Sequence, residues 1–324
     1  MKAIKISNTG GADVLKLSDT EPVPKPGAQE ALIKIHSAGV NFVDIYHRRG
    51  LYPVKLPFIP GLEASGVVES VGAAVTEFQP GDRVAYTGHL GSYSEYTTIN
   101  AAQLIKLPES ISFIDGAAFP LQGMTAHYLI HDFRSVKRGD FVLIHAAAGG
   151  VGGLLVQWAR HIGATVIGTA GTGEKAAAAV QAGADHIILY TEKDVAAETM
   201  RLTNGHGADL ILDGVGKTTF AADMNAVAVR GHVVVYGAAS GPADPVAPNN
   251  LMAKSFSLSG GSLGNFTATR EDLLRRSGDV LNAIRDGWLK LRIDSILPLA
   301  EVEKAHRLLE GRSSRGKIVL SVVE

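Results

Sequence analysis

A short apolar run that stops at a glycine-rich turn constrains the fold of this 324-residue chain more than any other feature. Residues 141–152 read FVLIHAAAGGVG, and a helix-like stretch, GLLVQWAR, follows at 153–160. A second apolar run at 164–169 completes a strand–helix–strand unit of the ~30 residues that a dinucleotide-binding motif requires. Such a turn leaves backbone N–H groups without partners at a helix N-terminus, where the helix dipole favours an anion. We therefore predict that this turn binds the pyrophosphate of a nucleotide.

The residues of the turn have separable predicted roles. Gly149 lets the backbone approach the phosphates, and Gly152 lets helix and strand pack closely. The usual fingerprint places glycine at positions 147, 149 and 152, whereas this chain has Ala147 and an additional glycine at position 150. The residues that we predict to bind the cofactor here are Gly149, Gly150, Val151 and Gly152.

Composition and charge argue against several classes of function. The chain is 46% hydrophobic, but its apolar runs are short and strand-like, so we expect a large core and no membrane span. The N-terminal MKAIKI enters a β-like alternation directly, without a signal-peptide pattern, which favours a cytoplasmic protein. The net charge is −1, with no basic block, so no nucleic-acid partner is expected. The absence of cysteine excludes disulfides, thiolate zinc sites and cysteine nucleophiles.

The sequence changes character near residue 115, which predicts two domains. Before it, residues 31–36 and 65–71 alternate like strands, and residues 80–85 read as a turn that leads into a strand. After it, residues 117–133 have helical spacing, and strands then alternate with helices, which predicts a parallel sheet covered on both faces. The strands expected there are 141–145, 165–168, 186–189, 210–213 and 233–236, and the helices include 173–181 and 195–203.

The last sixty or so residues return to mixed character, with a helix expected at 270–286 and a final strand at 317–322. We expect this tail to pack on the N-terminal domain. The predicted domains are therefore residues 1–122 together with 265–324, and residues 123–264.

The second strand of the unit indicates which nicotinamide cofactor is bound. An acidic residue ~20 positions beyond the glycines binds the ribose 2′-hydroxyl of NAD. Residues 167–175 read IGTAGTGEK, so no carboxylate ends the strand and Glu174 comes only later. A 2′-phosphate is thereby permitted, and Lys175 is placed to supply a cation, although it also fits an ordinary exposed residue in the first turn of a helix. We favour NADPH as the cofactor.

Three further stretches join the glycine turn in a family pattern. They are GVNFVDIY (39–46) continuing to GLYP (50–53), PGLEASG (60–66) and PGDRV (80–84). With these, the whole chain resembles the medium-chain dehydrogenase/reductase superfamily, and within it the zinc-independent, zeta-crystallin-like quinone oxidoreductase branch. The resemblance implies an α/β protein with a GroES-like β domain, a Rossmann doubly wound parallel sheet and a cofactor in the interdomain cleft.

The zinc-dependent branch of the superfamily differs from this chain at its metal ligands. It places a cysteine where this chain has Asn41, a histidine before glutamate where this chain has Leu62–Glu63, and a third ligand near Leu121–Gln122. Because a catalytic zinc needs three protein ligands and an open position, we predict no metal. The retained carboxylates, Asp44 and Glu63, are expected to make structural hydrogen bonds. His127 and His131 lie four apart but lack a third ligand, so we expect surface or partly buried histidines.

The resemblance also implies cofactor contacts, position by position. Asn41 and Thr125 look like nicotinamide-side residues, and Gly237 matches a position whose backbone lines the nicotinamide ribose. Lys175, Tyr190 and Arg312 match positions around the adenosine 2′-phosphate, where cations donate charge-assisted hydrogen bonds. Without the resemblance, Tyr190 would be interpreted as a strand-end aromatic residue and Arg312 as a surface cation.

Without a metal, the cofactor supplies the chemistry and the protein supplies orientation. We predict hydride transfer from NADPH to a quinone, with Tyr46 and Tyr52 orienting the acceptor and Asn41 beside the nicotinamide. An interpretation of the two tyrosines as core or rim aromatic residues of the β domain is almost equally well supported.

Reduction of a conjugated enone is the alternative activity, and a non-catalytic crystallin-like or RNA-binding role is a further one. We also expect a homodimer formed through an edge of the Rossmann sheet, for which residues 255–263 are the candidate.

Overall fold

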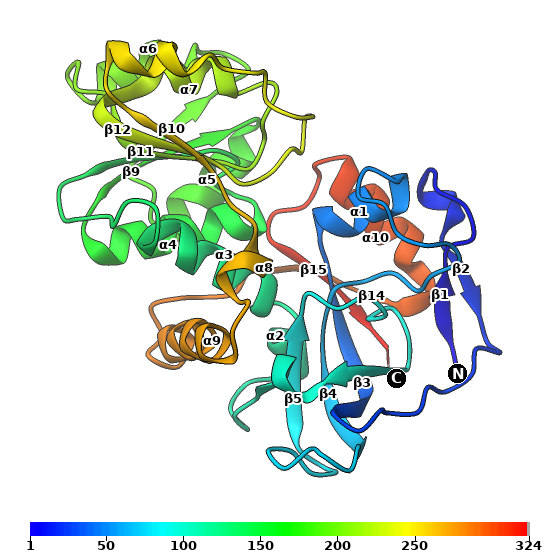
Figure 1. Ribbon diagram of the computed structural model, residues 1–324. Coiled ribbons are helices and arrows are strands. Elements are labelled where there is room, and N and C mark those ends of the chain that lie inside the picture. The colour runs from blue at the N-terminus through cyan, green and yellow to red at the C-terminus, as the bar shows by residue number, and fades with distance from the viewer. Residues whose placement is uncertain (323–324) are drawn as a thin grey trace. The chain divides into compact units, whose positions relative to one another are not determined.

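The computed structural model describes residues 1–322, which form two compact units (Figure 1). Unit 1 contains Met1–Leu121, Ala268–Ser277 and the chain from Ile293 onward, and unit 2 contains Gln122–Thr267 and Gly278–Arg292. Residues 278–292, which the sequence analysis assigned to the N-terminal domain, thus belong to unit 2. Their side chains explain this, because Trp288 packs edge-on against Trp158 with ring centroids 5.2 Å apart.

Unit 1 is built on a seven-stranded sheet in the order β14-β15-β3-β4-β5-β7, with β6 also paired to β3. Its strands are β3 (Glu30–Val40), β4 (Glu63–Val71), β5 (Arg83–Thr87), β6 (Tyr96–Asn100), β7 (Ile105–Lys106), β14 (Ile293–Pro298) and β15 (Lys317–Ser321). A separate pair is formed by β1 (Ala3–Lys5) and β2 (Lys16–Ser18). The strands expected at 31–36 and 65–71 are confirmed within β3 and β4, and the turn at 80–85 does lead into β5.

The core of unit 1 follows from the alternation of its strands. Ile33 and Ile35 of β3 are fully buried and belong to one apolar cluster with Val84, Ile318 and Leu320. Strand β15 pairs antiparallel with β3, so the C-terminal strand completes this sheet as expected. Short helices lie beside the sheet: α1 (Phe42–Arg49), α2 (Phe113–Gly116) and α10 (Val302–Glu310).

Unit 2 is a six-stranded parallel sheet in the order β10-β9-β8-β11-β12-β13. The strands are β8 (Phe141–Ile144), β9 (Thr165–Ala170), β10 (His186–Leu189), β11 (Ala208–Asp213), β12 (Val227–Val235) and β13 (Ser257–Gly260). The helices are α3 (Pro120–His131), α4 (Gly150–Ile162), α5 (Gly173–Ala182), α6 (Val195–Leu202), α7 (Phe220–Ala226) and α8 (Leu263–Phe266), and α9 (Arg270–Arg285) runs from unit 1 into unit 2.

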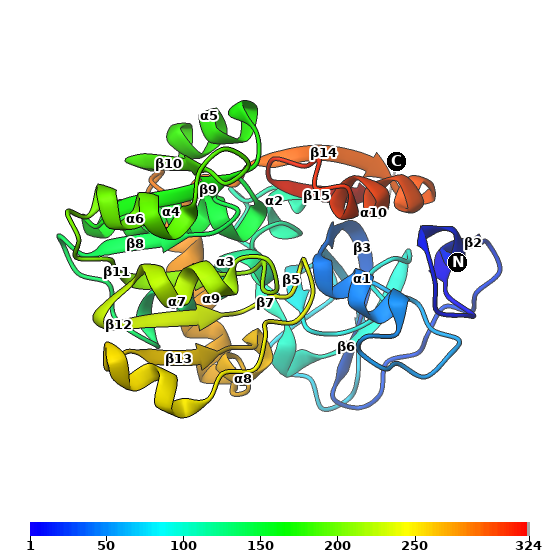
Figure 2. The same cartoon turned by 90° about the horizontal axis from the view of Figure 1, so that it is seen from above.

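Helices cover both faces of this sheet, with α4 on one face and α6 and α7 on the other (Figures 1 and 2). Its central strands are buried on both sides, and Leu143, Ile167, Ile211 and Val233 have no exposed surface. Such strands read as continuous apolar runs rather than alternating ones, which explains why the sequence predicts them well. The expected doubly wound parallel sheet is confirmed.

Several element boundaries differ from the sequence-based expectation, and two of these differences in unit 2 have a local cause. Helix α4 begins at Gly150 rather than 153, because the glycine turn already provides the first helical turn. Strand β12 begins at Val227 rather than 233. The polar Arg230 interrupts the apolar run, and its φ is positive at 61°, but the strand continues through it. No helix in the described part of the chain has the length and apolar character needed to cross a membrane.

Candidate functional site

The glycine-rich turn forms the N-terminus of α4. Its N-cap, Gly149, has an extended backbone and provides no side-chain cap. The first N–H groups of an α-helix have no partner within the helix, and together with the helix dipole they suit an anion. The structure thus places the predicted cofactor residues at one helix N-terminus, while their contact with a cofactor stays a prediction; they are Gly149, Gly150, Val151 and Gly152.

Two glycines of unit 2 are required by a close approach of backbone segments. A Cβ on Gly152 would overlap the Ala146 carbonyl oxygen and lie 3.1 Å from Ala147 Cα. A Cβ on Gly237, just beyond β12, would lie 2.6 Å from the Gly214 carbonyl oxygen. Gly152 therefore permits the tight helix–strand packing that the sequence predicts for it. Gly237 lies against the segment that follows β11.

Lys175 and Tyr190 lie near the carboxyl end of β9. The side chain of Thr172, the N-cap of α5, accepts a hydrogen bond from the Lys175 N–H at 3.3 Å. The Tyr190 N–H donates to the Ala170 carbonyl at 3.2 Å, and its ring covers Gly171, where a Cβ would lie 2.8 Å from Tyr190 Cζ. The structure therefore brings two of the three residues predicted to surround a 2′-phosphate to the same strand end.

The other predicted cofactor residues are divided between the units. Thr125 is buried within α3 of unit 2. Arg312 follows α10 in unit 1 and has a positive φ of 52°. Asn41 also belongs to unit 1, so the joint action of this set on one cofactor stays a prediction.

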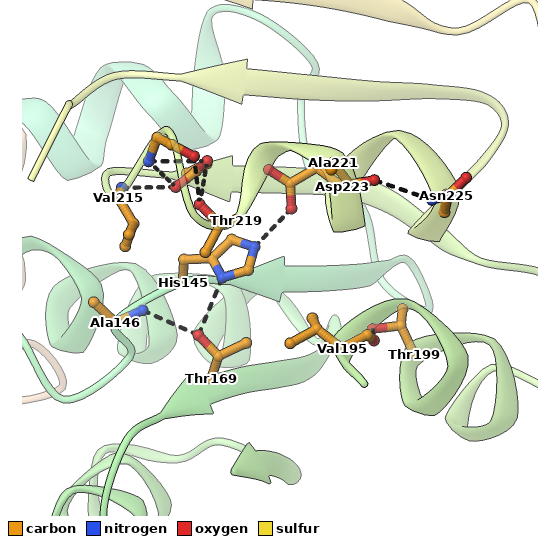
Figure 3. A network of polar contacts seen from close by, with 12 residues as sticks. His145, Ala146, Thr169, Val195, Thr199, Val215, Thr219, Ala221, Asp223 and Asn225 are labelled. Carbon is orange, nitrogen blue, oxygen red and sulfur yellow. Dashed lines mark hydrogen bonds and ion pairs between the residues drawn. The ribbon is translucent and has the colours of Figure 1, made fainter. Parts of the chain in front are cut away.

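A buried polar network lies directly behind the glycine turn (Figure 3). His145 follows β8, and its Nε2 lies 2.6 Å from Asp223 Oδ1 of α7. Its Nδ1 lies 3.1 Å from the Thr169 hydroxyl of β9, which also accepts the Ala146 N–H at 3.3 Å. From the sequence, His145 was expected only as the last residue of the strand at 141–145, and Thr169 and Asp223 were not predicted. The available signal was a histidine inside an apolar run, immediately before the turn.

The charges of this network are strongly coupled. Burial raises the pKa of Asp223 to about 6, and the neighbouring imidazole opposes this rise. Burial by itself lowers the pKa of His145, but the carboxylates of Asp223 and Asp213 outweigh it, so the pKa is raised. Asp213 accepts hydrogen bonds from the N–H groups of Val215 and Gly216, which fixes the loop after β11.

The predicted catalytic residues lie on or beside α1. Asn41 is its N-cap, Tyr46 lies within it, and Tyr52 follows its left-handed C-cap, Gly50. The rings of Tyr46 and Tyr52 meet edge to face with centroids 5.3 Å apart. Tyr52 is 51% exposed and Tyr46 is half-buried, so neither is a core residue. The structure brings the two tyrosines together, and their action on a substrate stays a prediction.

A buried ammonium group that the sequence analysis did not consider lies against Asn41. Lys317, at the start of β15, is 2% exposed, and its Nζ donates to Asn41 Oδ1 at 2.7 Å and to Glu63 Oε2. Asn41 Nδ2 in turn donates to Glu63 Oε2 at 2.9 Å and to the Gly39 carbonyl at 3.3 Å. Glu63 Oε1 accepts the Leu121 N–H at 2.6 Å. Both amide hydrogens of Asn41 are used within the protein and its Oδ1 already accepts from Lys317 Nζ, so a hydrogen bond from a ligand would use the second lone pair of Oδ1.

A directed chain of hydrogen bonds ends at the start of α1. Arg48 Nη1 lies 3.1 Å from His306 Nδ1, and since arginine only donates, Nδ1 accepts and Nε2 carries the hydrogen. That Nε2 then donates to Tyr93 Oη at 3.3 Å, and Tyr93 donates to Asp44 Oδ2 at 2.8 Å. Burial, followed by the charge of Arg48, lowers the pKa of His306 to about 3, which agrees with a neutral ring. Asp44 Oδ2 also accepts the Asn41 N–H at 2.8 Å, so the chain helps to fix Asn41.

Asp44 itself is fully buried, and burial raises its pKa to about 7 despite the hydrogen bonds from Asn41 and Tyr93. Its Oδ1 is buried without a hydrogen-bond partner among residues 1–322. The expectation that Asp44 and Glu63 make structural hydrogen bonds is confirmed.

The positions that the resemblance aligns with zinc ligands do not fit a zinc ion. Asn41 offers an amide, Glu63 is ion-paired with Lys317, and Leu121 takes part through its backbone N–H. A buried ammonium beside both side chains repels a cation, and the thiolates and imidazole that zinc prefers are missing from this donor set.

One of the two histidines on α3 differs from its expected placement. His127 is buried at 3% exposure, with Nε2 2.9 Å from Asp279 Oδ2, whereas His131 is exposed. Over residues 1–322, no group of three histidine, cysteine, aspartate or glutamate side chains is arranged to hold a metal ion.

Known proteins match this chain over almost its full length. The family model described as alcohol dehydrogenase GroES-like domain matches residues 27–109, and the one described as zinc-binding dehydrogenase matches residues 150–277. The quinone oxidoreductase of Pseudomonas aeruginosa is 39% identical over 322 residues, covering 98% of this chain and 99% of that protein. The 2-haloacrylate reductase of a Burkholderia species is 38% identical over 327 residues, covering 98% of each. The Escherichia coli quinone oxidoreductase complexed with NADPH has a TM-score of 0.96 at 35% identity, covering 99% of this chain and 100% of that one.

A GroES-like unit together with a doubly wound unit that carries a glycine-rich turn defines a medium-chain dehydrogenase/reductase. The full-length relatives then place the chain within this superfamily: it belongs to the quinone oxidoreductase branch. The resemblance and the fold class predicted from the sequence are both confirmed.

Proposed function

We propose that this protein is an NADPH-dependent quinone reductase that uses no metal. The observation that carries the proposal is the uncapped glycine N-terminus of α4 in a chain whose full-length relatives include quinone oxidoreductases, one of them solved with NADPH. An anion site at this position of a Rossmann unit is where a dinucleotide pyrophosphate binds.

The residues at the end of β9 fit NADPH better than NADH. No carboxylate ends this strand, and Lys175 and Tyr190 lie beside the short glycine and threonine segment that follows it. A carboxylate there would accept the ribose 2′-hydroxyl of NADH and repel a 2′-phosphate. Lys175 would hold the 2′-phosphate as a cation, with Tyr190 beside it and Arg312 as the further predicted contact.

When bound, NADPH supplies a hydride from its nicotinamide ring. The α4 N-terminus would hold the pyrophosphate, and Asn41 would accept a hydrogen bond through Oδ1 while the Lys317–Glu63 pair keeps its side chain in place. Tyr46 and Tyr52 would orient the acceptor and donate a hydrogen bond to its oxygen. A quinone needs no Lewis acid because its reduced form is aromatic, which agrees with a donor set that does not fit zinc.

A second candidate activity is reduction of a conjugated carbonyl compound. The 38% identity to a 2-haloacrylate reductase over 98% of both chains favours it specifically. The same hydride chemistry would reduce the β-carbon of an enone, so the two activities share every cofactor contact.

Steady-state oxidation of NADPH and of NADH with 1,4-benzoquinone, in protein treated with EDTA, tests the proposal. Turnover with NADPH that survives chelation and exceeds turnover with NADH supports it. Turnover only with 2-haloacrylate or an enone would instead support the second candidate, reduction of a conjugated carbonyl compound. If neither cofactor bound to the protein, both candidates would be wrong.

We further propose a homodimer in the cytoplasm. Strand β13 lies at the edge of the unit 2 sheet, and an open strand edge is a template for pairing with a second copy. A chain without cysteine has no disulfide that would need an oxidising compartment. Light scattering of the purified protein tests the dimer, since a monomeric mass would contradict it.

A further inference from the structure

The first residue of the glycine turn controls the shape of the turn. Ala146 has a positive φ of 49°, a left-handed conformation that residues with a Cβ rarely adopt. Its carbonyl oxygen accepts the Gly149 N–H at 2.8 Å, and Gly152 packs directly against the same carbonyl. The conformation of Ala146 therefore sets the positions of the two glycines nearest the predicted pyrophosphate.

Thr169 holds Ala146 in this conformation. Its hydroxyl accepts the Ala146 N–H at 3.3 Å, and its carbonyl accepts the Ala147 N–H at 3.1 Å. Thr169 is 1% exposed, so water does not replace these bonds readily. The hydroxyl is in turn fixed by His145 Nδ1 at 3.1 Å, and His145 Nε2 by Asp223 Oδ1 at 2.6 Å (Figure 3).

Neither the proposed hydride transfer nor the packing of the sheet requires this polar network. His145 and Asp223 are fully buried beneath the turn. A buried acid–imidazole pair contributes less to stability than well-packed apolar side chains of similar size, so its presence beside the turn suggests a positioning role. The orientation of each group is determined by the next: Asp223 aligns the imidazole, and the imidazole aligns the hydroxyl.

We propose that Asp223, His145 and Thr169 form a positioning relay that fixes Ala146 and so determines the affinity of the turn for the pyrophosphate of the cofactor. The inference rests on the proposed binding of NADPH. The relay acts on cofactor binding and leaves the hydride step itself unchanged.

Two substitutions of Thr169 test the relay. Thr169→Val keeps the shape of the side chain and removes its hydroxyl, whereas Thr169→Ser keeps the hydroxyl. A buried N–H that loses its partner shifts an equilibrium by roughly tenfold, so Thr169→Val should raise the Kd for NADPH roughly tenfold with little change in kcat. Thr169→Ser should bind NADPH nearly as the wild type does.

Thr199→Val provides a matched control. Thr199 is also fully buried in unit 2, and its hydroxyl donates to the Val195 carbonyl at 2.7 Å, on α6 and without contact to the turn. This variant should lower the Tm without changing the Kd for NADPH. If Thr169→Val and Thr199→Val lowered the Tm alike and both left the Kd unchanged, Thr169 would be merely structural and the relay would be refuted.

A double-mutant cycle tests whether the members act as one chain. Asp223→Asn should by itself raise the Kd for NADPH by roughly threefold, because a charge-assisted hydrogen bond becomes a neutral one. Combined with Thr169→Val it should add nothing further, since the chain is already broken at the hydroxyl. Fully additive effects, or a single Asp223→Asn variant that binds like the wild type, would contradict the relay.

The same titrations separate this inference from the proposed function. A wild type that does not bind NADPH overturns the proposed function and the relay together. A wild type that binds NADPH, with a Thr169→Val variant that binds equally well, overturns the relay alone.

Discussion

Removing the ammonium group of Lys317 should destabilise unit 1 strongly. Lys317 and Glu63 are almost completely buried, and Glu63 accepts hydrogen bonds from Lys317, Asn41 and the Leu121 N–H. In Lys317→Met the buried carboxylate loses its only cationic partner among the contacts described. Breaking a buried ion pair from one side costs about 3–5 kcal/mol, and we expect a loss in this range.

A second substitution, Glu63→Gln, tests whether the unpaired carboxylate causes the loss of stability in Lys317→Met. In the double variant Lys317→Met/Glu63→Gln, the glutamine carbonyl oxygen still accepts a hydrogen bond but carries no charge. Neutralising the remaining charge of a broken buried pair recovers much of the loss, so the double variant should be more stable than Lys317→Met by about 2 kcal/mol. An exposed pair in the same unit, Lys304 with Glu301, provides the control: Lys304→Met should change stability by less than ~1 kcal/mol.

Urea unfolding followed by far-UV circular dichroism measures these differences. Fluorescence is unsuitable, because both tryptophans, Trp158 and Trp288, belong to unit 2 and do not report directly on unit 1. The reasoning is refuted if Lys317→Met loses less than ~1 kcal/mol, or if adding Glu63→Gln lowers the stability further instead of restoring it.

Three further outcomes are expected. Because burial raises the pKa of Asp44 from 3.8 to about 7, its contribution to stability is complete below its unfolded pKa and is lost as the pH rises through 7. The free energy of unfolding of Asp44→Asn, measured in urea titrations, should therefore rise by ~2–3 kcal/mol relative to that of the wild type between about pH 5 and 8. A difference between the two proteins that does not change with pH would contradict this. Gly152→Ala should abolish measurable NADPH binding, because its Cβ would overlap the Ala146 carbonyl; retained binding would show that α4 can shift. Lys175→Ala should raise the KM for NADPH roughly tenfold and leave that for NADH unchanged, and an equal rise for both would remove the 2′-phosphate role.

Local sequence patterns predict the architecture of unit 2 because its strands are buried on both faces. A strand such as β8 or β9 needs an unbroken apolar run, and a run followed by glycines and a helical period identifies the strand–turn–helix unit without tertiary information. Boundaries were less well predicted where the backbone departs from the pattern. Arg230 interrupts the apolar run of β12 but continues its strand, and the glycines that open α4 have low helix propensity.

The candidate site divides in the same way. The glycine turn, Lys175 and the two tyrosines are recognisable in the sequence, because each belongs to a short motif or follows one closely. Lys317 could not be recognised as part of the site, because it lies 254 positions from Glu63 and 276 from Asn41. No local motif distinguishes it from the other lysines of the chain. The same holds for Asp223, which is 78 positions from His145.

The sequence by itself determined the class of fold, the glycine-rich turn at a helix N-terminus and the lack of a zinc ligand set, because these depend on hydrophobic periodicity, glycine spacing and residue type within short windows. Only the tertiary structure showed which buried charges are partners: Lys317 with Glu63 and Asn41, and His145 with Asp223 and Thr169. Burial and pairing depend on distances across strands and helices that are remote along the chain. A residue's type gives its charge in water, but whether that charge is solvated, paired or isolated is decided by the fold around it.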